Sequence, residues 1–500
     1  MNQDHYNGGC SLPPLPVLES VVDTYFEYHY SPVETFLLES SFREDLAAGT
    51  LPTYLLLAVL AAGVPLSPEV YYEGKRIRAA EAYAEESWLL VKTEALAHPK
   101  LDVVETLGVL CRIKHRAGAL SFAYKILSLL VKTSRALHMM AEPPSSLPFV
   151  QQEHRRRIAW IIFILDAILA GGKSRPTPEI QDGECTLQMP CDEETFRAGE
   201  WQGTLTINDL LADDSPGDEP LHGVCLLALL IMIYGKCKTY VHRDGLQDRF
   251  PPWRTDSGFA QIESLLDQAK LRLEIHNLRE IEAYRNGIAT ARVEASYVLL
   301  ARINLHQGQC LLRHPFFVRQ ILKRFESEPE AAAFTMYNLD TANQHARLLV
   351  DLINAQYEAG GFTNESTGYC YYMIVAGSIL SLASHFELNR GQPADSLIHL
   401  KRCLVALERL GEMWPEAANE IDNLCAFHSR YASTFAASLD PPCTSKDTEL
   451  TAEQALSDLL DPELVVTPLF EPMDPLLSFK FRPRWPSASE SSGTNTAIVP

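Results

Sequence analysis

Two short stretches carry residue types that bind phosphate groups in proteins. Gly171 to Ser174 reads Gly-Gly-Lys-Ser, which is the end of a phosphate-binding loop, where glycine N–H groups and a lysine surround the phosphates. The segment 211–219 (LADDSPGDE) has clustered carboxylates of the kind that hold magnesium beside a diphosphate. Either site would indicate a nucleotide-binding protein or an enzyme.

The phosphate-loop interpretation fails on spacing. A complete motif has a further glycine five positions before Gly172, where this chain has Ala167. The motif also follows a strand, whereas the apolar run that precedes Gly171 is long enough for a helix. We therefore predict that Gly171-Gly172 ends a helix, because glycine adopts the left-handed conformation without steric cost.

The aspartate cluster at 211–219 is superficially similar to the magnesium site of terpene cyclases. Such carboxylates must project from one face of a helix, and Pro216-Gly217 interrupts any helix here. We predict an acidic surface loop. The chain also has no H-E-x-x-H, no G-x-S-x-G and no Cys/His pair at catalytic spacing, so we predict no catalytic, cofactor-binding or metal-binding residues and no enzyme activity. We expect His138 and His314 to be hydrogen-bonded residues in or near the core.

The element that precedes the twin glycines is predicted to be a buried helix. Residues 154–170 are apolar on nearly every side except for Asp166. A buried carboxylate needs a partner, so we expect Lys173 or Arg175 beside it, unless Asp166 reaches solvent through a gap between helices. Residues 155–157 are three arginines, which we interpret as a solvated face or as bridges to acidic neighbours rather than as a DNA contact.

Net charge argues against direct binding to DNA by this chain. It has 43 basic and 64 acidic side chains and a formal charge of −21, whereas phosphate neutralisation needs a clustered basic surface. The eleven cysteines are scattered and include no C-x-x-C pair, which favours reduced thiols in a nuclear or cytosolic protein.

Neither a signal peptide nor a membrane span is expected. The first sixteen residues lack a basic start and an apolar core. The longest apolar runs, near 53–64, 158–170 and 224–234, are shorter than the roughly 18 residues that cross a bilayer.

Apolar residues recur at three- and four-residue spacing from Leu18 to about Ala436, which predicts many packed helices. Gly118 is expected at the turn of an antiparallel helix pair. We predict an all-α fold, a large multi-helix bundle over residues 17–436, with a flexible segment at 1–16 and an acidic, proline-rich, largely disordered tail at 437–500.

The tail has a segment that could act in activation. Nine acidic side chains and one lysine lie between Asp440 and Asp474. Thr451 and Gln454 form a capping-box pattern for a short helix that stops before Pro462. Its apolar residues are Ala455, Leu456, Leu459 and Leu460. They would bind a partner, as acidic activation segments do, or fold back on the parent domain.

These landmarks resemble the regulatory (middle homology) domain of the fungal transcription factors that carry a binuclear zinc cluster. The order of the motifs along about 18–435 carries the resemblance. The central motif is Glu153, Arg155, Arg156, Arg157, Trp160, Asp166, Arg175, Pro176, Asp182, Leu187 and Pro190. The flanking matches are Tyr54 to Ala62, Gly118 with Ala123 and Ala136-Leu137-His138, Leu311 to Phe317, and Leu404, Leu407, Leu410 and Trp414.

The family's DNA-binding module needs six cysteines at fixed spacing to hold two zinc ions, and this chain shows no such set. The resemblance therefore implies a nuclear transcriptional regulator that reaches DNA through a partner or an absent N-terminal zinc cluster. Implied partners are other transcription factors or coactivators, a second copy of the chain, and a small-molecule effector. The alternatives are an interaction protein that forms mixed dimers with a zinc-cluster factor, and an all-helical enzyme whose buried pocket gathers carboxylates or histidines.

Overall fold

The computed structural model describes residues 11–28, 36–170, 177–181, 183–200, 203–211, 221–285, 291–358, 368–391, 394–411, 416–439 and 446–460. Within these ranges the chain forms nineteen α-helices, three short 3₁₀ helices and one isolated β-bridge between Gln188 and Thr206. The predicted all-α fold is confirmed for this part of the chain. Residues 1–467 cluster as one compact unit, and the segment after it lies outside the described ranges.

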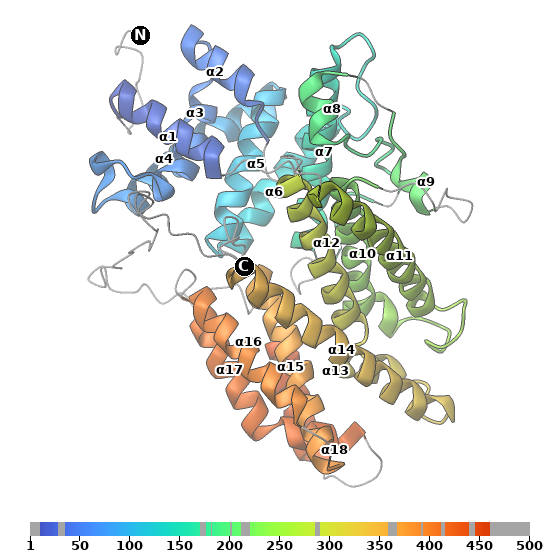
Figure 1. Ribbon diagram of the computed structural model, residues 1–500. Coiled ribbons are helices and arrows are strands. Elements are labelled where there is room, and N and C mark those ends of the chain that lie inside the picture. The colour runs from blue at the N-terminus through green and yellow to red at the C-terminus, as the bar shows by residue number, and fades with distance from the viewer. Residues whose placement is uncertain are drawn as a thin grey trace, which may run out of the picture. The chain divides into compact units, whose positions relative to one another are not determined.

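The first group of helices packs around α3. The group consists of α1 (Leu15–Tyr28), α2 (Glu39–Ala48), α3 (Thr53–Gly63), α4 (Arg76–Ala97), α5 (Leu101–Arg116) and α6 (Leu120–Ala136). Every side chain from Leu55 to Ala61 is buried, and α3 contacts α1, α4 and α5 (Figure 1). Gly118 forms the turn between α5 and α6 with φ of 68°, a conformation that glycine adopts without strain, so the predicted helix pair is confirmed.

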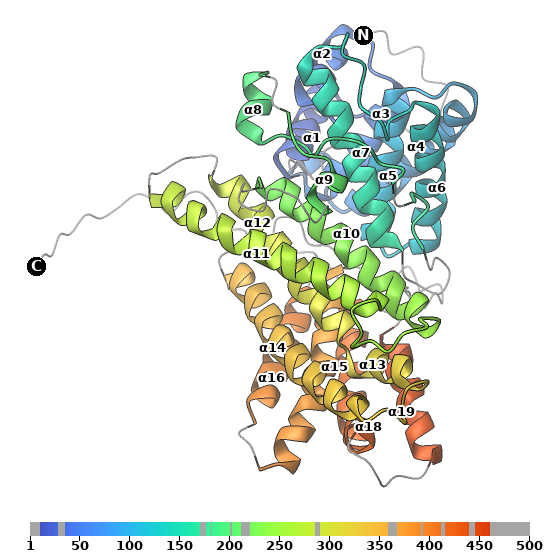
Figure 2. The same ribbon diagram turned by 90° about the vertical axis from the view of Figure 1, so that its right-hand side faces the viewer.

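The second group is built on α10. It consists of α7 (Phe149–Leu169), α8 (Glu193–Ala198), α9 (Ile207–Leu211), α10 (Gly223–His242), α11 (Gly258–Arg285), α12 (Ala291–Leu312) and α13 (Pro315–Leu322). Helix α10 contacts α7, α11 and α12, and α10, α11 and α12 lie side by side in Figure 2. At Gly235 an added Cβ would come within 3.2 Å of the Ala167 Cβ, so glycine allows α7 and α10 to approach closely.

The third group is built on α15. It consists of α14 (Glu330–Glu358), α15 (Gly368–Asn389), α16 (Asp395–Gly411), α17 (Glu416–Arg430), α18 (Ala432–Leu439) and α19 (Lys446–Leu459). Helix α15 contacts α14, α16, α17 and α18, and also α12 of the second group. One cluster of buried apolar side chains runs from Leu18 to Leu460, so the three groups share a core.

Two helices in the described ranges are long and apolar enough to cross a membrane, contrary to the expectation from the sequence. They are Gly223–His242 and Tyr369–Leu388, with mean hydropathy of 1.7 and 1.2. In each helix, 89% of the apolar window is buried inside the protein. Their composition is that of core helices surrounded by other helices.

The predicted start of the last helix is wrong. Helix α19 begins at Lys446, so Thr451 lies inside it rather than at a cap, and Gln454 Nε2 donates to Asp458 Oδ1 at 2.9 Å. Ala452 and Leu456 are fully buried, and α19 contacts α13, α17 and α18. For residues 446–460 the structure selects the alternative in which the apolar face folds back on the parent domain.

Candidate functional site

The triple-arginine segment builds a buried charge cluster on α7. Glu153 is 1% exposed and accepts hydrogen bonds from two guanidinium groups. Its Oε2 lies 2.7 Å from Arg156 Nη1, and its Oε1 lies 3.2 Å from Arg157 Nε. Arg156 also pairs with Glu142 at 2.9 Å. The interpretation as bridges to acidic neighbours is confirmed for Arg156 and Arg157, while Arg155 is half-buried.

Hydrogen bonds set the charge state of this cluster. Burial lowers the pKa of the Arg156 guanidinium, but the hydrogen bonds that it donates to Glu142 and Glu153 raise the pKa, and the net shift is upward. Arg156 therefore stays charged despite its burial. A buried cation held by two carboxylates is a structural element and is not available to a phosphate backbone.

The same helix holds residues 188–191, which lie far from it in the chain. Cys191 N donates to Glu153 Oε1 at 2.9 Å, and Arg157 Nη2 donates to the Cys191 carbonyl at 3.0 Å. Trp160 Nε1 donates to the Gln188 carbonyl at 2.8 Å. The motif residues thus fasten this segment to α7.

Asp166 fastens residues 179 and 180, which precede the segment 188–191 in the chain. It is fully buried, and its carboxylate accepts the backbone N–H groups of Glu179 at 3.1 Å and Ile180 at 2.7 Å. The expected cation partners, Lys173 and Arg175, lie outside the described residues, as do Gly171-Gly172, Pro176 and Asp182. The solvent-facing alternative for Asp166 is wrong, because hydrogen bonds from backbone N–H groups offset the cost of burying the carboxylate.

The end of α7 is capped from α10. Helix α7 ends at Leu169, and Ala170 has an extended conformation. The buried Lys238 donates to the carbonyls of Ile168 (2.6 Å) and Ala170. A cation at a helix C-terminus meets unsatisfied carbonyls and the negative end of the dipole. The twin glycines therefore follow a helix and not the strand that a phosphate loop requires.

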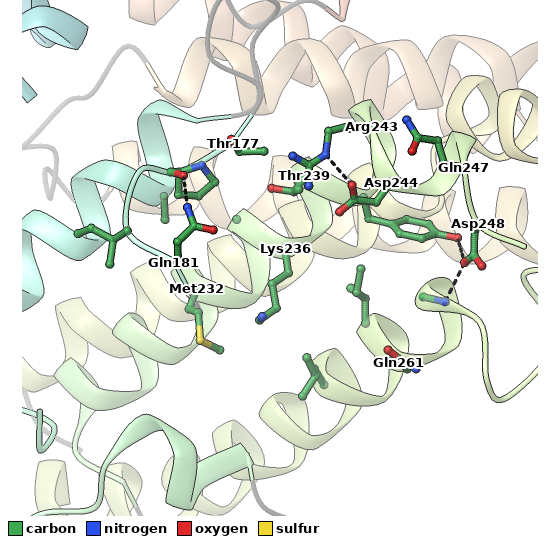
Figure 3. Close-up of a pocket in the computed structure, with 18 of the residues that line it drawn as sticks. Thr177, Gln181, Met232, Lys236, Thr239, Arg243, Asp244, Gln247, Asp248 and Gln261 are labelled. Carbon is green, nitrogen blue, oxygen red and sulfur yellow. Dashed lines mark hydrogen bonds and ion pairs between the residues drawn. The ribbon is translucent and has the colours of Figure 1, made fainter. Parts of the chain in front are cut away.

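A cleft of about 800 Å³ opens beside Asp166, between α7, α10, α11 and the 3₁₀ helix η4 (Asp244–Leu246) (Figure 3). Residues 177–181, which Asp166 holds in place, form part of its wall. The apolar lining includes Phe163, Ile180, Met232, Ile262 and Leu265. The polar lining includes Thr177, Gln181, Lys236, Thr239, Arg243, Gln247, Arg249 and Gln261.

Four aspartates also border the cleft, and each is bonded to a different neighbour. Asp166 accepts the loop N–H groups described above. Asp244 pairs with Arg243 at 2.6 Å, and Asp256 pairs with Arg254 at 2.8 Å. Asp248 accepts the Tyr240 hydroxyl at 3.1 Å and the Gly258 N–H at 2.8 Å. The carboxylates do not converge on a common point, and no group of three metal-ligating side chains occurs among the described residues.

The two histidines singled out by the sequence have different outcomes. His314 is fully buried; its Nδ1 accepts the Phe316 N–H at 3.2 Å, so its Nε2 carries the proton towards Ser378 Oγ at 2.9 Å. Burial lowers the pKa of His314 to about 3, so the ring is neutral. The core prediction is confirmed for His314 and wrong for His138, which is exposed with φ of 52° at the turn after α6.

The predicted acidic loop at 211–219 cannot be compared with the structure, because residues 212–220 are outside the described ranges.

Among the described cysteines, eight are buried and one is exposed, and all are free thiols. Burial raises the pKa of Cys185 to about 11 and that of Cys237 to about 12. Such thiols are protonated at neutral pH and are poor nucleophiles.

The cleft was not foreseen from the sequence. The run 224–234 was recognised only as apolar, yet α10 lines the cleft with Met232, Gly235, Lys236, Thr239 and Tyr240, and Arg243 follows directly after the helix. Those spacings of three and four place them on one helical face. The sequence signal that could have indicated the cleft is the pair of polar residues Lys236 and Thr239, which share one face near the end of an otherwise apolar helix.

Comparison with known protein families finds a match for the first group of helices and for the second group as far as α10. Residues 22–237 match the family model described as "Fungal specific transcription factor domain". This segment begins in α1 and ends in α10, and it contains the charge cluster, Asp166 and the inner wall of the cleft.

Several curated proteins are similar in sequence. Zn(2)-C6 fungal-type transcription factor FTF2 of Fusarium oxysporum is 23% identical over 413 residues, which cover 77% of this chain and 37% of that protein. Factor FTF1c of the same fungus is 27% identical over 210 residues, covering 40% and 22%. An uncharacterized transcriptional regulatory protein of Schizosaccharomyces pombe is 22% identical over 282 residues, covering 51% and 28%.

The chain thus matches less than half the length of each of these relatives. The matched family segment contains the landmarks from Tyr54 through the α7 motif to Pro190. The later landmarks of the resemblance, Leu311 to Phe317 and Leu404 to Trp414, lie outside it. Residues 22–237 of this chain are therefore similar to the fungal specific transcription factor domain, and the chain is similar to a protein named as a Zn(2)-C6 fungal-type transcription factor.

Proposed function

We propose that this protein regulates transcription in the nucleus through its helical domain. The observation that carries the proposal is the match of residues 22–237 to the fungal specific transcription factor domain. Its relatives FTF1c and FTF2 are named as transcription factors. The α7 motif is compatible with the same role, because its charged residues Glu153, Arg156 and Arg157 pair with one another inside the protein.

The proposed domain organisation is a helical regulatory body followed by an acidic tail. Helix α19 falls within the predicted tail of residues 437–500, but it packs on α13, α17 and α18, so the proposed tail begins after residue 460. Glu453 on α19 lies 3.3 Å from Arg319 Nε and 3.2 Å from Lys323 Nζ, both on or next to α13. An effector or partner that shifted α19 would change how the tail is presented to the transcription machinery.

A reporter assay tests the function. The full chain is fused to a neutral DNA-binding domain and expressed beside the same fusion truncated after residue 460. A regulator changes reporter output relative to the DNA-binding domain alone, and an activating tail makes the full-length signal larger than the truncated one. Unchanged output from the full-length fusion contradicts the regulatory role, and equal signals from both fusions contradict the activating tail.

Partners of this regulator are proposed to be proteins. The formal charge of −21 favours contact with DNA through a zinc-cluster protein, as a mixed dimer, or through a zinc cluster at the N-terminus of a longer chain. Purification of the tagged chain from fungal nuclei, followed by mass spectrometry, tests this. Recovery of a zinc-cluster protein at equal amount supports the mixed dimer, and a nuclear fraction free of the chain contradicts nuclear action.

A further inference from the structure

The exposed side of α6 carries a basic surface in a strongly acidic chain. Residues 106–141 include six lysines and arginines and no aspartate or glutamate, although the formal charge of the whole chain is −21. We propose that the α6 surface, defined by Phe122, Lys125, Leu129 and Lys132, binds an acidic amphipathic helix of a partner protein. The proposal builds on the proposed role of protein partners, but its test is direct binding and can fail while the reporter and nuclear experiments succeed.

The first support is that two lysines of this surface are available to a partner. Lys125 and Lys132 are exposed and lie seven residues apart, which places them on one face of α6. Neither forms an ion pair or a hydrogen bond among the residues that the structure describes. Helix α6 packs on α4, α5 and α7 with its buried side and lies at the edge of the first group of helices in Figure 2.

The second support is the charge that remains on this face. Arg135, one turn after Lys132, pairs with Glu184 at 2.6 Å and is therefore balanced. Between the two lysines, the Ser128 hydroxyl donates a hydrogen bond to the carboxylate of Glu179. One carboxylate beside two lysines leaves the surface with an excess of positive charge, which favours an acidic partner.

The third support is an apolar row beside the lysines. Phe122 and Leu129 are half-buried and also lie seven residues apart, each three positions before one of the two lysines. The Phe122 ring meets the edge of Trp88 on α4 at 5.4 Å between ring centres, and Lys114 Nζ lies 5.5 Å from the Phe122 ring centre. A helix with an apolar stripe bordered by carboxylates matches an apolar row next to a basic row.

The spacing favours a helical protein segment over a nucleic acid. Lys125 and Lys132 are about 10 Å apart along the axis of α6, because each residue of an α-helix rises about 1.5 Å. Two carboxylates seven residues apart on a partner helix have the same spacing. A phosphate backbone needs more clustered cations than this surface offers, and the formal charge of −21 opposes its approach.

Fluorescence anisotropy of labelled peptides with the purified full chain tests the proposal. The acidic probe is a helical peptide of about 20 residues, with leucines on one face and glutamates seven residues apart beside them. The neutral probe has glutamine in place of each glutamate. We expect the acidic probe to bind more tightly, and its affinity to fall with added salt because exposed ion pairs are screened.

Charge reversal on α6 locates the binding surface. Lys125→Glu combined with Lys132→Glu should weaken the acidic probe by about tenfold, because two attractive contacts become repulsive. A third peptide, with lysine in place of each glutamate, should bind this double variant about as tightly as the acidic probe binds the wild type. Lys401→Glu, exposed on α16, makes the same change of charge elsewhere and should not affect binding. Circular dichroism of each variant verifies that the helices are intact.

Four outcomes would contradict the proposal. Equal binding of the acidic and neutral probes, or unchanged affinity in the folded double variant, overturns the α6 surface as an acidic-helix site. Tighter binding of a short DNA duplex than of the acidic probe overturns the choice of a protein. Tighter binding of the acidic probe by a chain that ends after residue 460 assigns the surface to the acidic tail, and a dimer that the double variant separates assigns it to a second copy. Either of these last two results overturns the choice of a different protein as the partner.

Discussion

At the scale of single residues, the charged side chains of α7 act inside the protein. Glu153 lies between Arg156 and Arg157, and each of the three is nearly inaccessible to solvent. A buried carboxylate between two guanidinium groups is stable only as a set, because removal of one member leaves an uncompensated charge. This explains why an arginine triplet occurs in a chain with a strongly acidic balance.

Replacing Glu153 should therefore be costly. Glu153→Gln removes the shared carboxylate and leaves two buried guanidinium groups with one partner fewer. We expect the free energy of unfolding to fall by about 3–5 kcal/mol, the usual range for breaking a buried pair. Thermal unfolding followed by circular dichroism measures the change.

Glu142→Gln is the matched control, because Glu142 pairs with the same Arg156 but its side chain is 38% exposed. Solvent screens such a pair, so a loss of about 1 kcal/mol or less is expected. Equal losses in the two variants would show that burial of Glu153 is not the cause of its importance.

A second residue-scale prediction concerns a histidine pair between α12 and α14. The Nδ1 atoms of His306 and His345 are 2.8 Å apart. Burial, with help from nearby Lys270 and Arg302, lowers the pKa of His306 to about 4. Burial, followed by His306 and Arg313, lowers the pKa of His345 to about 3. Both rings are neutral in the folded protein at physiological pH.

The sign of the pH effect is set by these shifts. Unfolded histidine has a pKa of about 6.5, so below that value the unfolded chain binds more protons than the folded one. The stability is fully present above about pH 6.5 and falls as the pH drops towards 4, by on the order of 1–2 kcal/mol per histidine at about pH 5. His345→Gln should make the melting temperature less dependent on pH, and the exposed His98→Gln should not. An unchanged dependence in His345→Gln would contradict the assignment.

At the scale of elements, contacts with neighbouring helices fix the positions of two segments, residues 180–188 and helix α19. Asp166 and Trp160 on α7 hold the backbone near Ile180 and Gln188, which sets one wall of the cleft. Helix α19 is held by its apolar face and by Glu453. In both cases packed helices of the body fix the position of a neighbouring segment.

Helix α19 should detach when its apolar face is cut back. Leu456→Ala removes a fully buried side chain, and such changes cost about 2–5 kcal/mol. The helix has 14 residues and is marginal without tertiary contacts, so the loss should appear as local opening. Hydrogen exchange of residues 446–460 should speed up by more than tenfold, with little change in α3 or α10.

Gln454→Ala is the control for this experiment, because Gln454 is exposed on the same helix. It should leave exchange in 446–460 close to that of the wild type. Equal exchange in Leu456→Ala and wild type would mean that α19 does not depend on the core for its helical structure.

At the scale of the whole molecule, one core reaches from Leu18 to Leu460. Residues 1–467 cluster as one compact unit. The buried face of α19 and the residue after it contribute to the shared core through Ala452, Leu456, Leu459 and Leu460. The stability of the body should therefore depend on α19 and not on residues 468–500.

Two truncations test this division. Ending the chain after residue 467 should leave the melting temperature unchanged, because no described residue of the shared core is removed. Ending it after residue 445 removes α19 and uncovers the apolar surface of α13, α17 and α18, so the melting temperature should fall by several degrees, on the order of 1 °C per kcal/mol lost for a body of this size. Equal melting of both truncations would contradict the inclusion of α19 in the body.

The sequence was sufficient for the class of fold and for the family landmarks. Helical spacing of apolar residues, Gly118 at a turn and the buried run before Ala170 were all predicted and are confirmed, because each depends on local preference and on one-dimensional periodicity. The landmark order from Tyr54 to Pro190 was also recognised, and residues 22–237 match the family model.

Only the tertiary structure decided which contacts the charged residues of α7 and the apolar face of α19 make. Asp166 accepts backbone N–H groups of a loop, Arg156 is shared by Glu142 and Glu153, and α19 packs on the body. The cleft was not predicted, because its walls come from segments as distant as Phe163 and Gln261. Periodicity reports which face of a helix is apolar, whereas the neighbour that covers that face is set by packing among segments far apart in the chain.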